Sequence, residues 1–314
     1  MGTSVFDGCS KLKQVYWNCK NLTTVPMRTF DSVGTLEEVF FSEEAAKNIV
    51  TIGEEAFNLS TSYAKNLKMN FNSLRNLTSI KTSAFDGSGL TLIDDNKEVI
   101  SKLNIPIGIT SLGSRAFART KFTEVYFPNT FKEFNMYEFS NSQVKKIYFD
   151  EDREEIAIGD SSFMSSQLQE IINSECIVEI KNSSFYSAPL NATENITFNN
   201  VKKISFQSFG LTKVKELSLP KLEYCEHVAG GRAEPFYRSE IEILEFGPSF
   251  GQEERHEEKF YNEITSSFFE GSKINTIKFR GTLEDWCSRI ITSVDSDWPF
   301  LKEKMNEAGE VIYD

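Results

Sequence analysis

Ile52-Gly53-Glu54-Glu55-Ala56-Phe57 is the clearest copy of a pattern that recurs along the chain. The pattern is an apolar residue, four variable residues and a phenylalanine, and further clear copies are Ile80–Phe85, Leu112–Phe117, Ile158–Phe163 and Ile180–Phe185. With the less regular copies included, its phenylalanines are Phe6, Phe30, Phe57, Phe85, Phe117, Phe139, Phe163, Phe185, Phe209, Phe236 and Phe269. Their shortest spacings, 22 to 24 residues, give the basal period, and the longer ones, up to 33, indicate insertions. A period of this size is typical of solenoids, in which one short unit is repeated and stacked.

A second motif follows most of these phenylalanines and has the form apolar-x-x-apolar-x-apolar. Representative copies are Leu12, Val15 and Trp17; Phe122, Val125 and Phe127; and Ile274, Ile277 and Phe279. The alternation at the end of the motif predicts a short strand with one buried face. A unit made of one strand, a turn and the apolar-x4-Phe segment cannot bury its apolar side alone. Neighbouring units must therefore stack and pair their strands.

Together the two motifs predict a leucine-rich-repeat-like solenoid, a right-handed coil of about eleven degenerate turns with one parallel sheet face. The phenylalanines are expected to form a continuous interior stack. We assign residues 1–280 to the solenoid and residues 281–314 to a C-terminal cap and tail. At the start of the cap, Thr282 is predicted to be the N-cap of a short helix, with Asp285 completing an imperfect capping box. Trp286 and Ile290 would then face one way and shield the last strand.

The repeats resemble those of the BspA-like leucine-rich repeat family. The resemblance is carried by Ile52–Phe57 and Leu112–Phe117, by the Phe-to-Leu links Phe6–Leu12 and Phe85–Leu90, and by the strand-Gly-Thr-x-x-x-Trp ending in Ile277–Trp286. It covers about residues 1 to 290. Members of that family are typically surface or secreted proteins of microbes, so the resemblance implies adhesion to host proteins or other cells. The fold by itself does not determine function.

Charge and hydropathy exclude several classes of partner. The chain of 314 residues has a net charge of -12. Such a surface repels phosphate backbones, because non-specific affinity for nucleic acid comes from Lys and Arg. No basic run longer than a lysine pair occurs, so neither nucleic acid nor an anionic membrane surface is expected as a partner. No apolar stretch of about 18 residues is present, and the first ten residues do not read as a signal peptide, so membrane insertion is not expected either.

The sequence offers no recognisable set of residues for catalysis, a cofactor or a metal. Of the two histidines, His256 lies in a charged loop and His227 has no partner that the pattern identifies, which argues against a Ser-His-Asp site. The motifs of phosphate-binding, dinucleotide-binding and zinc-protease sites are missing. The five cysteines are odd in number and lack Cys-x-x-Cys spacing, which favours free thiols, with pairing of Cys9 and Cys19 as the alternative. We therefore predict a protein that is not an enzyme, a carboxylate pair being the remaining catalytic alternative.

The outward positions of the strand motif form the predicted binding surface. The residues on either side of the central apolar position point away from the core, and stacking places them side by side. In the N-terminal half these positions combine aromatic and acidic residues, and the candidate ligand-binding residues are Tyr16, Phe40, Tyr126, Tyr148, Glu38 and Glu124. A stripe of exposed aromatics resembles the core of an interface. The alternative is that aromatics favour strands wherever they point.

We therefore expect an adhesin-like, protein-binding repeat protein that holds another protein or a glycan on its open sheet face. The resemblance favours the cell surface or the secreted fraction, whereas the missing signal peptide leaves a cytoplasmic or virion-associated location open. Two other functions are consistent with the sequence: a structural subunit of a larger assembly, such as a virion or appendage, and an intracellular scaffold. The chain begins inside a repeat, and an uncapped turn exposes apolar core and strand edge, which favours self-association through this turn.

Overall fold

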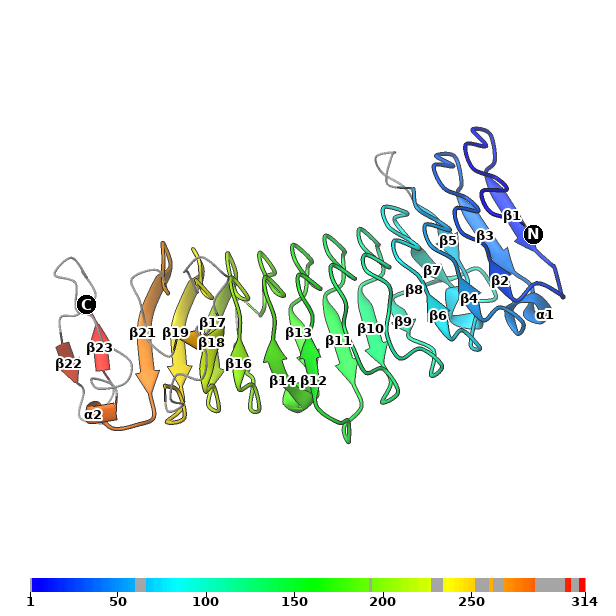
Figure 1. Ribbon diagram of the computed structural model, residues 1–314. Coiled ribbons are helices and arrows are strands. Elements are labelled where there is room, and N and C mark those ends of the chain that lie inside the picture. Colours follow the sequence, from blue (N-terminus) through cyan, green and yellow to red (C-terminus); the bar gives the residue numbers. More distant parts are fainter. Residues whose placement is uncertain are drawn as a thin grey trace. The chain divides into compact units, whose positions relative to one another are not determined.

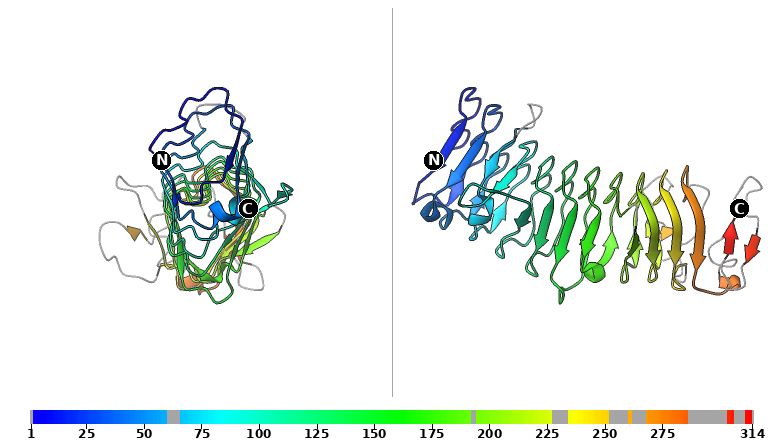
Figure 2. Two further views of the ribbon diagram at one scale, coloured as in Figure 1. Left: turned by 90° about the vertical axis from the view of Figure 1, so that its right-hand side faces the viewer. Right: turned by 180° about the vertical axis from the view of Figure 1, so that it is seen from behind.

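The protein divides into two compact units, and each is described by itself (Figure 1). The computed structural model describes residues 2–59, 66–191, 194–226, 234–251, 260–261, 268–285, 303–305 and 311–313. Unit 1 comprises residues 1–154 and 162–173, and unit 2 comprises residues 155–161 and 174–314. In both units successive turns of the chain stack and pair parallel strands, as the two further views in Figure 2 show. The fold is therefore the parallel β-solenoid that the repeat predicts.

Each turn of unit 1 contributes a strand from the apolar-x-x-apolar-x-apolar motif, and these strands form what we call the main ladder. They are β1 (Gln14–Trp17), β3 (Glu38–Phe41), β5 (Lys68–Met69), β7 (Thr91–Ile93), β9 (Lys102–Asn104), β10 (Glu124–Phe127), β11 (Lys146–Phe149) and β13 (Glu170–Ile172). The predicted alternation is confirmed in β3, β10 and β11, where buried and half-buried residues follow one another. The remaining elements are β2 (Thr24–Val25), β4 (Thr51–Ile52), β6 (Ser79–Ile80), β8 (Val99–Ile100), the helix α1 (Glu43–Ala46) and the 3-10 turn η1 (Phe71–Ser73).

Unit 2 repeats this plan with longer strands in its main ladder, which is formed by β15 (Asn195–Thr197), β17 (Lys213–Leu219), β19 (Glu240–Phe246) and β21 (Lys273–Phe279). A second sheet contains β12 (Ile156–Ile158), β14 (Ile177–Ile180), β16 (Lys203–Ile204), β18 (Tyr224–Glu226) and the antiparallel β20 (Phe260–Tyr261). The other elements are η2 (Ser174–Cys176), α2 (Leu283–Asp285), β22 (Glu303–Met305) and β23 (Val311–Tyr313).

The apolar-x4-Phe segment opens with a strand of its own, which the sequence pattern did not predict. In unit 1 these second strands pair as β2-β4-β6, and in unit 2 they form the sheet from β12 to β18. Most are two residues long, which is too short to show alternation, so the sequence signal was limited to one apolar residue. Most turns are therefore held by two ladders rather than by a single sheet face.

The recurrent phenylalanines form the interior stack that the sequence predicts. Consecutive rings from Phe6 to Phe163 in unit 1 lie 5.0–5.7 Å apart between centroids and are stacked within 17° of parallel. The backbone sets this alignment, because the N–H of one phenylalanine donates to the carbonyl of the residue before the next one. The bonds from Phe30 to Ala56 and from Phe57 to Ala84, of 2.9 and 2.8 Å, are examples. Ring packing and interturn hydrogen bonds thus select the same register.

The glycine of the Ile/Leu-Gly-x-x-Ala-Phe blocks allows neighbouring turns to approach each other. A Cβ at Gly53 would lie 2.6 Å from the backbone nitrogen of Met27, and one at Gly113 would lie 2.2 Å from that of Thr82. Both glycines also donate from N–H to the previous turn, Gly53 to Val25 and Gly113 to Ile80. A side chain at either position would force these turns apart.

The number of turns is about nine rather than the expected eleven. Nine of the eleven phenylalanines, Phe30 to Phe236, follow a residue that pairs in a second strand or in the Ser111–Glu133 bridge. In the described part of the chain no residue before Phe6 pairs in this way, and β20, which precedes Phe269, pairs with β18 antiparallel rather than parallel. The first and last phenylalanines therefore mark turns that lack the parallel second-strand pairing of the other nine within the described residues.

The start of the predicted C-terminal cap has the expected capping box. The Asp285 N–H donates to Thr282 Oγ1 over 3.0 Å, and the Thr282 N–H donates back to Asp285 Oδ2 over 3.3 Å. The strand β23 lies beside β21, the last strand of the main ladder. Trp286 and Ile290 lie outside the described residues. Assignment of residues 281–314 to a cap and tail stays a proposal, which the position of β23 supports.

Candidate functional site

The six candidate residues all lie on the outward face of the main ladder of unit 1, where they form two patches rather than one stripe. The N-terminal patch is Tyr16 on β1 with Glu38 and Phe40 on β3, and Tyr16 is in register with Phe40. The central patch is Glu124 and Tyr126 on β10 with Tyr148 on β11, and the two tyrosines are in register. The prediction that neighbouring turns place these residues side by side therefore holds within each patch and not between them.

Two features of the chain separate the patches. After β3 the main ladder continues into β5 and Asn70, whose side-chain amide is buried and bonded to both the N–H and the carbonyl of Phe41, each over 2.9 Å. Next, β7 and β8 form an antiparallel hairpin, so the ladder ends there and resumes at β9. This hairpin is the insertion that the 32-residue spacing between Phe85 and Phe117 indicates.

The two tyrosines of the central patch are held by carboxylates. Tyr148 donates from its hydroxyl to Glu124 Oε2 over 2.6 Å, and Ser101 Oγ donates to the other oxygen of Glu124 over 2.8 Å. Tyr126 donates to Asp150, whose second oxygen accepts the Asn129 N–H over 3.0 Å. Because each phenol is anchored to a carboxylate on a neighbouring turn, both rings are fixed on the sheet face before any ligand arrives.

These hydrogen bonds shift the ionisation of the patch. The bond to Asp150, reinforced by burial, raises the pKa of Tyr126 to about 12. The bond to Glu124 likewise raises the pKa of Tyr148, while the bonds from Tyr148 and Ser101 lower the pKa of Glu124. At neutral pH the patch therefore contains protonated phenols and the ionised carboxylate of Glu124.

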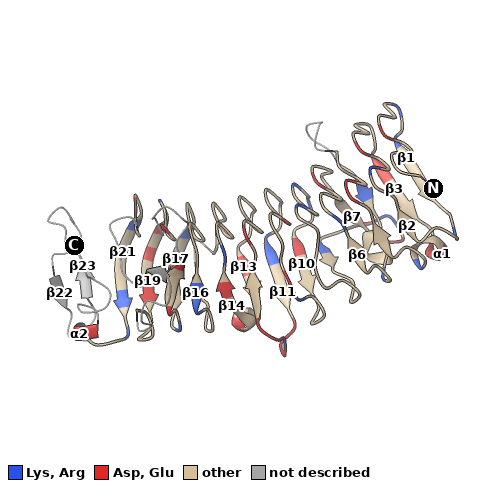
Figure 3. Cartoon of the chain, in the orientation of Figure 1, with Lys and Arg blue, Asp and Glu red and all other residues tan. Residues whose placement is uncertain are grey.

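A row of alternating charge runs beside the tyrosines. Lys102, Glu124, Lys146 and Glu170 are in register on β9, β10, β11 and β13, and Figure 3 shows the change of colour from β10 to β13. Lys146 pairs with Glu170 over 2.6 Å. The Lys102 and Lys146 ammonium groups lie 4.3 and 5.3 Å from the centre of the Tyr148 ring. The central patch thus offers an aromatic surface bordered by charges of both signs.

The N-terminal patch contacts Lys97, a residue that the sequence analysis did not select. Lys97 lies in the turn of the β7–β8 hairpin, and its Nζ is 2.6 Å from Glu38 Oε1 and 3.0 Å from the Tyr16 hydroxyl oxygen. The hydrogen bonds to Glu38 and then Tyr16 raise the pKa of Lys97. A hairpin signal was present in the sequence, because the five polar residues Asp94–Glu98 separate two strand-like runs, Thr91–Ile93 and Val99–Ile100.

In unit 2 the outward face of the main ladder is bridged by its own ion pairs. Glu240 on β19 lies between Lys213 on β17 and Lys273 on β21, at 2.8 and 3.2 Å. These three residues border a shallow depression of about 380 Å³. Further along, Lys278 pairs with Glu216 and Arg280 with Glu245. The charges in this region therefore stabilise the register of three neighbouring strands.

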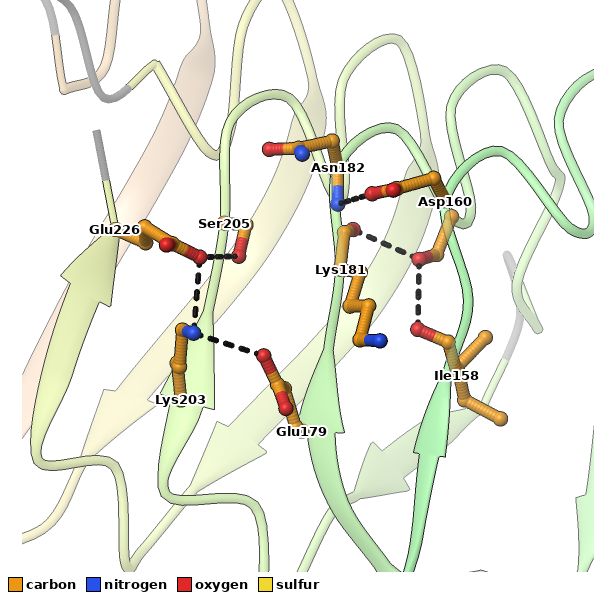
Figure 4. Close-up of polar contacts among 9 residues, drawn as sticks. Ile158, Asp160, Glu179, Lys181, Asn182, Lys203, Ser205 and Glu226 are labelled. Carbon is orange, nitrogen blue, oxygen red and sulfur yellow. Dashed lines mark hydrogen bonds and ion pairs between the residues drawn. The ribbon is translucent and has the colours of Figure 1, made fainter. Parts of the chain in front are cut away.

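The second sheet of unit 2 contains a similar ion pair network on its outward side. Lys203 on β16 is 2.9 Å from both Glu179 on β14 and Glu226 on β18, as Figure 4 shows. Burial alone would lower the pKa of Lys203, but the bonds to Glu179 and Glu226 outweigh it and raise that pKa. Ser205 donates to the same Glu226 carboxylate over 3.1 Å. This cluster is internally satisfied, which fits a structural role in holding three turns together.

The other residues considered from the sequence do not form a site in the described structure. Cys9, Cys19 and Cys225 are free thiols, the first two exposed, so Cys9 and Cys19 are not paired. Both histidines lie outside the described residues. Within the described ranges no group of three or more His, Cys, Asp or Glu side chains could hold a metal ion. Nor does any helix in the described part of the chain have the length and apolar character needed to cross a membrane.

Comparison with known proteins identifies the family. The sequence matches the BspA type leucine rich repeat region in six copies, over residues 1–101, 95–215 and 158–294. No curated protein sequence gives a significant match. Among solved structures, a leucine rich cell surface protein from Faecalibacterium prausnitzii A2-165 is similar, with 13% identity, 94% of this chain and 86% of that chain covered, and a TM-score of 0.33. Since the family matches extend over most of the chain, in agreement with its stacked phenylalanines and paired turns, this protein belongs to the BspA-type leucine-rich repeat family.

Proposed function

We propose that this protein is a non-catalytic interaction protein, located at the cell surface or secreted, that holds a partner protein on the outward face of β9–β13. The observation that carries the proposal is the central patch, with Tyr126 and Tyr148 in register and each phenol anchored to a carboxylate. Tyrosine is enriched among the residues that dominate binding energy at interfaces. Fixing the rings beforehand reduces the entropy that is lost when a partner binds.

The family supports the coarser part of this proposal. Repeat solenoids present extended surfaces on which other proteins are bound, and the family resemblance implies a surface or secreted protein. A cell-surface assignment is also what the Faecalibacterium protein's description gives for that protein. The alternating charges around the central patch fit a partner that carries both acidic and basic side chains, since complementary charges select the partner and its orientation.

The first experiment separates binding of a foreign partner from self-assembly. Light scattering would give the molar mass of the wild type and of a Tyr126→Ser/Tyr148→Ser double variant. We expect a monomer in both cases, which leaves the face free. A defined oligomer that dissociates in the double variant would show that the face is an assembly surface, and the structural-subunit alternative would replace the proposal.

A binding measurement then tests the patch directly. The labelled protein would be titrated onto a panel of extracellular proteins and cell surfaces, with the double variant beside it. We expect saturable binding that weakens at least about tenfold in the double variant, because truncating interface hot spots costs about 2 kcal/mol or more. Tyr137→Asn is the matched control: Tyr137 is a half-buried tyrosine away from the sheet face with φ of 60°, a conformation that Asn tolerates. Equal binding by the wild type and the double variant would contradict the proposal.

A further inference from the structure

The N-terminal patch encloses an ammonium group. The Nζ of Lys97 is 2.6 Å from Glu38 Oε1 and 3.0 Å from the Tyr16 hydroxyl oxygen. It also lies 4.8 Å from the centre of the Tyr16 ring and 5.2 Å from that of Phe40. One cation is thus in contact with a carboxylate, a hydroxyl oxygen and two aromatic rings, all contributed by β1 and β3. We call Tyr16, Glu38 and Phe40 the ammonium cage.

Each of these contacts is favourable for an ammonium ion. Aromatic rings attract a cation that lies within about 6 Å of the ring centre. The carboxylate supplies a charge-assisted hydrogen bond, and the hydroxyl oxygen accepts a second one. An ammonium group has three donors and no acceptor, so an arrangement of acceptors and ring faces suits it. The chemistry of the cage therefore suits a cationic nitrogen group, and the group that occupies it is the primary ammonium of Lys97.

The cage is built without any contribution from the hairpin. Tyr16 and Phe40 are neighbours in the register of β1 and β3, with ring centroids 6.5 Å apart, and Glu38 precedes Phe40 by two residues on the same face of β3. The strands are fixed from the inner side by buried Trp17, Val39 and Phe41. The position of the cage is thus determined by the solenoid core.

The hairpin, in turn, is held without Lys97. Asp95 accepts hydrogen bonds from Ser73 over 2.6 Å and from Asn70 over 3.2 Å. Asp94 closes the turn by accepting the N–H groups of Asn96 and Glu98, each over 2.9 Å. The Lys97 side chain is 41% exposed, and Tyr16 is 63% exposed. The side chain can therefore leave the cage while the hairpin and the strands stay in place, and the cage is then open to solvent.

We propose that the cage of Tyr16, Glu38 and Phe40 is a recognition site for the ammonium group of a lysine on a partner protein, and that Lys97 of this chain occupies it in the unbound state. The identity of the partner as a protein rests on the proposed function, whereas recognition of an ammonium group does not. The central patch and the cage both lie on outward positions of the main ladder of unit 1.

Lys97 competes with an incoming lysine for the cage. An incoming lysine gains the same contacts that Lys97 gives up, so the wild type binds with an affinity reduced by the fraction of molecules in which the cage is open. For exposed ion pairs and cation–π contacts of ordinary strength, that fraction is about one in five. Removal of Lys97 is accordingly expected to strengthen binding of an ammonium probe about fivefold.

The test uses Lys97→Gly, because the backbone of Lys97 has φ of 67° and glycine adopts this conformation without strain. The probe is Nα-acetyl-lysine N-methylamide, and Nα-acetyl-norleucine N-methylamide is its uncharged counterpart. Binding is followed through the NMR shifts of the Tyr16 ring. We expect Lys97→Gly to bind the lysine probe about fivefold more tightly than the wild type and to show no saturable shift with the norleucine probe. The second change Glu38→Gln in the same variant should abolish the gain.

Control variants separate the cage from other lysine–tyrosine contacts. Lys102→Ala removes the ammonium beside Tyr148 and should leave the affinity of the wild type for the lysine probe unchanged. Lys97→Asn provides a second way of emptying the cage, since asparagine also tolerates a positive φ. The proposal is overturned if both Lys97 variants bind the lysine probe no better than the wild type, or if they bind the norleucine probe equally well.

Failure of this proposal is distinguishable from failure of the proposed function. The Tyr126→Ser/Tyr148→Ser variant should bind the lysine probe as the wild type does, because its changes lie in the other patch. If the lysine probe fails to bind any variant while that double change still abolishes partner binding, the cage is wrong and the proposed function stands. If the lysine probe behaves as expected while the double change leaves partner binding intact, the proposed function is wrong and the cage stands.

Discussion

At the scale of single residues, the turn around each phenylalanine has an unusual backbone. Residues two positions before and two after it adopt positive φ in most turns, for example Arg115 and Arg119 at 59° and 58° around Phe117. Such angles are normally supplied by glycine or asparagine. Here Ser, Arg, Glu and Gln fill most of these positions, so no residue type in the pattern indicates this conformation. The interior phenylalanine was predictable from its spacing, whereas the shape of its turn was not.

Leu211 offers a test of the cost of this backbone. It has φ of 54° and a side chain that is 41% exposed, so little packing is lost when it is removed. We expect Leu211→Gly to raise the free energy of unfolding by about 0.5–1 kcal/mol, because glycine relieves the left-handed strain and loses part of that gain to its larger unfolded-state entropy. Urea denaturation measures the change. Lys215→Gly, in the extended strand β17, should have the opposite sign, and destabilisation by both variants would refute the argument.

Glu138 is a second residue whose environment the sequence does not reveal. It is fully buried at the position where most turns have Ala or Ser, and its carboxyl group accepts the Asn135 N–H over 2.8 Å. Burial raises its pKa well above 4.5. The folded state therefore binds a proton more tightly than the unfolded state. The stability that this provides is full below pH 4.5, and it is lost as the pH rises toward the folded-state pKa.

Replacing Glu138 by Gln removes this pH dependence. We expect the free energy of unfolding of Glu138→Gln, minus that of the wild type, to be larger at pH 8 than at pH 5. The increase is at most about 1.4 kcal/mol for each pH unit between the unfolded-state and folded-state pKa values of Glu138. Urea titrations at both pH values give the difference. Glu151→Gln changes an exposed acid of the same unit that does not act on Glu138 and serves as the control. An equal difference at the two pH values would mean that Glu138 ionises normally in the folded protein.

At the scale of elements, the strands of the main ladder were predictable and the second strands were not. Alternation over Glu124–Phe127 and Lys146–Phe149 identifies both the strand and its buried face. The second strands, such as Thr24–Val25, are too short to carry a period. The same limit explains why the candidate residues were assigned to one stripe. The outward direction of each side chain follows from alternation, but the hairpin that divides the ladder depends on pairing between distant residues.

The cross-strand bond from Tyr126 to Asp150 can be observed by titration. The pKa of Tyr126 is raised to about 12 by this bond and by burial. We expect Asp150→Asn to shift it toward about 10, the ordinary value for tyrosine. Absorbance of the tyrosinate at high pH, compared with a Tyr126→Phe variant that identifies the signal, measures the shift. Because the folded-state pKa of Tyr126 is raised, the stabilisation from this bond is present below pH 10. It is lost as the pH rises from about 10 to about 12. An unchanged titration in Asp150→Asn would exclude the bond.

The phenylalanine stack can be tested at one ring. Phe117 is fully buried, with Phe85 and Phe139 stacked on its two faces at 5.3 and 5.7 Å. We expect Phe117→Leu to lower the free energy of unfolding by about 1–2 kcal/mol, through lost contact and a small cavity. Phe206→Leu, at a half-buried position outside the stack, should cost less than about 0.5 kcal/mol. Chemical denaturation of both variants gives the comparison, and similar losses would show that stacking adds nothing specific.

At the scale of the whole molecule, repetition made the fold class predictable, because one pattern is tested many times along the chain. Contacts between distant turns were not predictable in the same way. Lys97 and Tyr16 are 81 residues apart, and no feature of either residue identifies the other. The turn count shows the same distinction. The phenylalanines also mark the first and last turns, where the described residues show no parallel second strand, so the sequence counts copies of the motif rather than regularly paired turns.

The hydrogen bonds between successive turns also determine how the protein would respond to mechanical load. Bonds such as the one from the Phe57 N–H to the Ala84 carbonyl run from turn to turn, so a pull along the stacking direction breaks them one turn at a time. Strands loaded in this way peel rather than shear. Each released turn of 22 to 24 residues would lengthen the chain by about 75–85 Å. We expect stretching of a single molecule by optical tweezers to give a series of small steps at low force, with larger steps from the turns that contain insertions. Under load, a protein of this design would lengthen turn by turn instead of breaking all its interturn contacts at once.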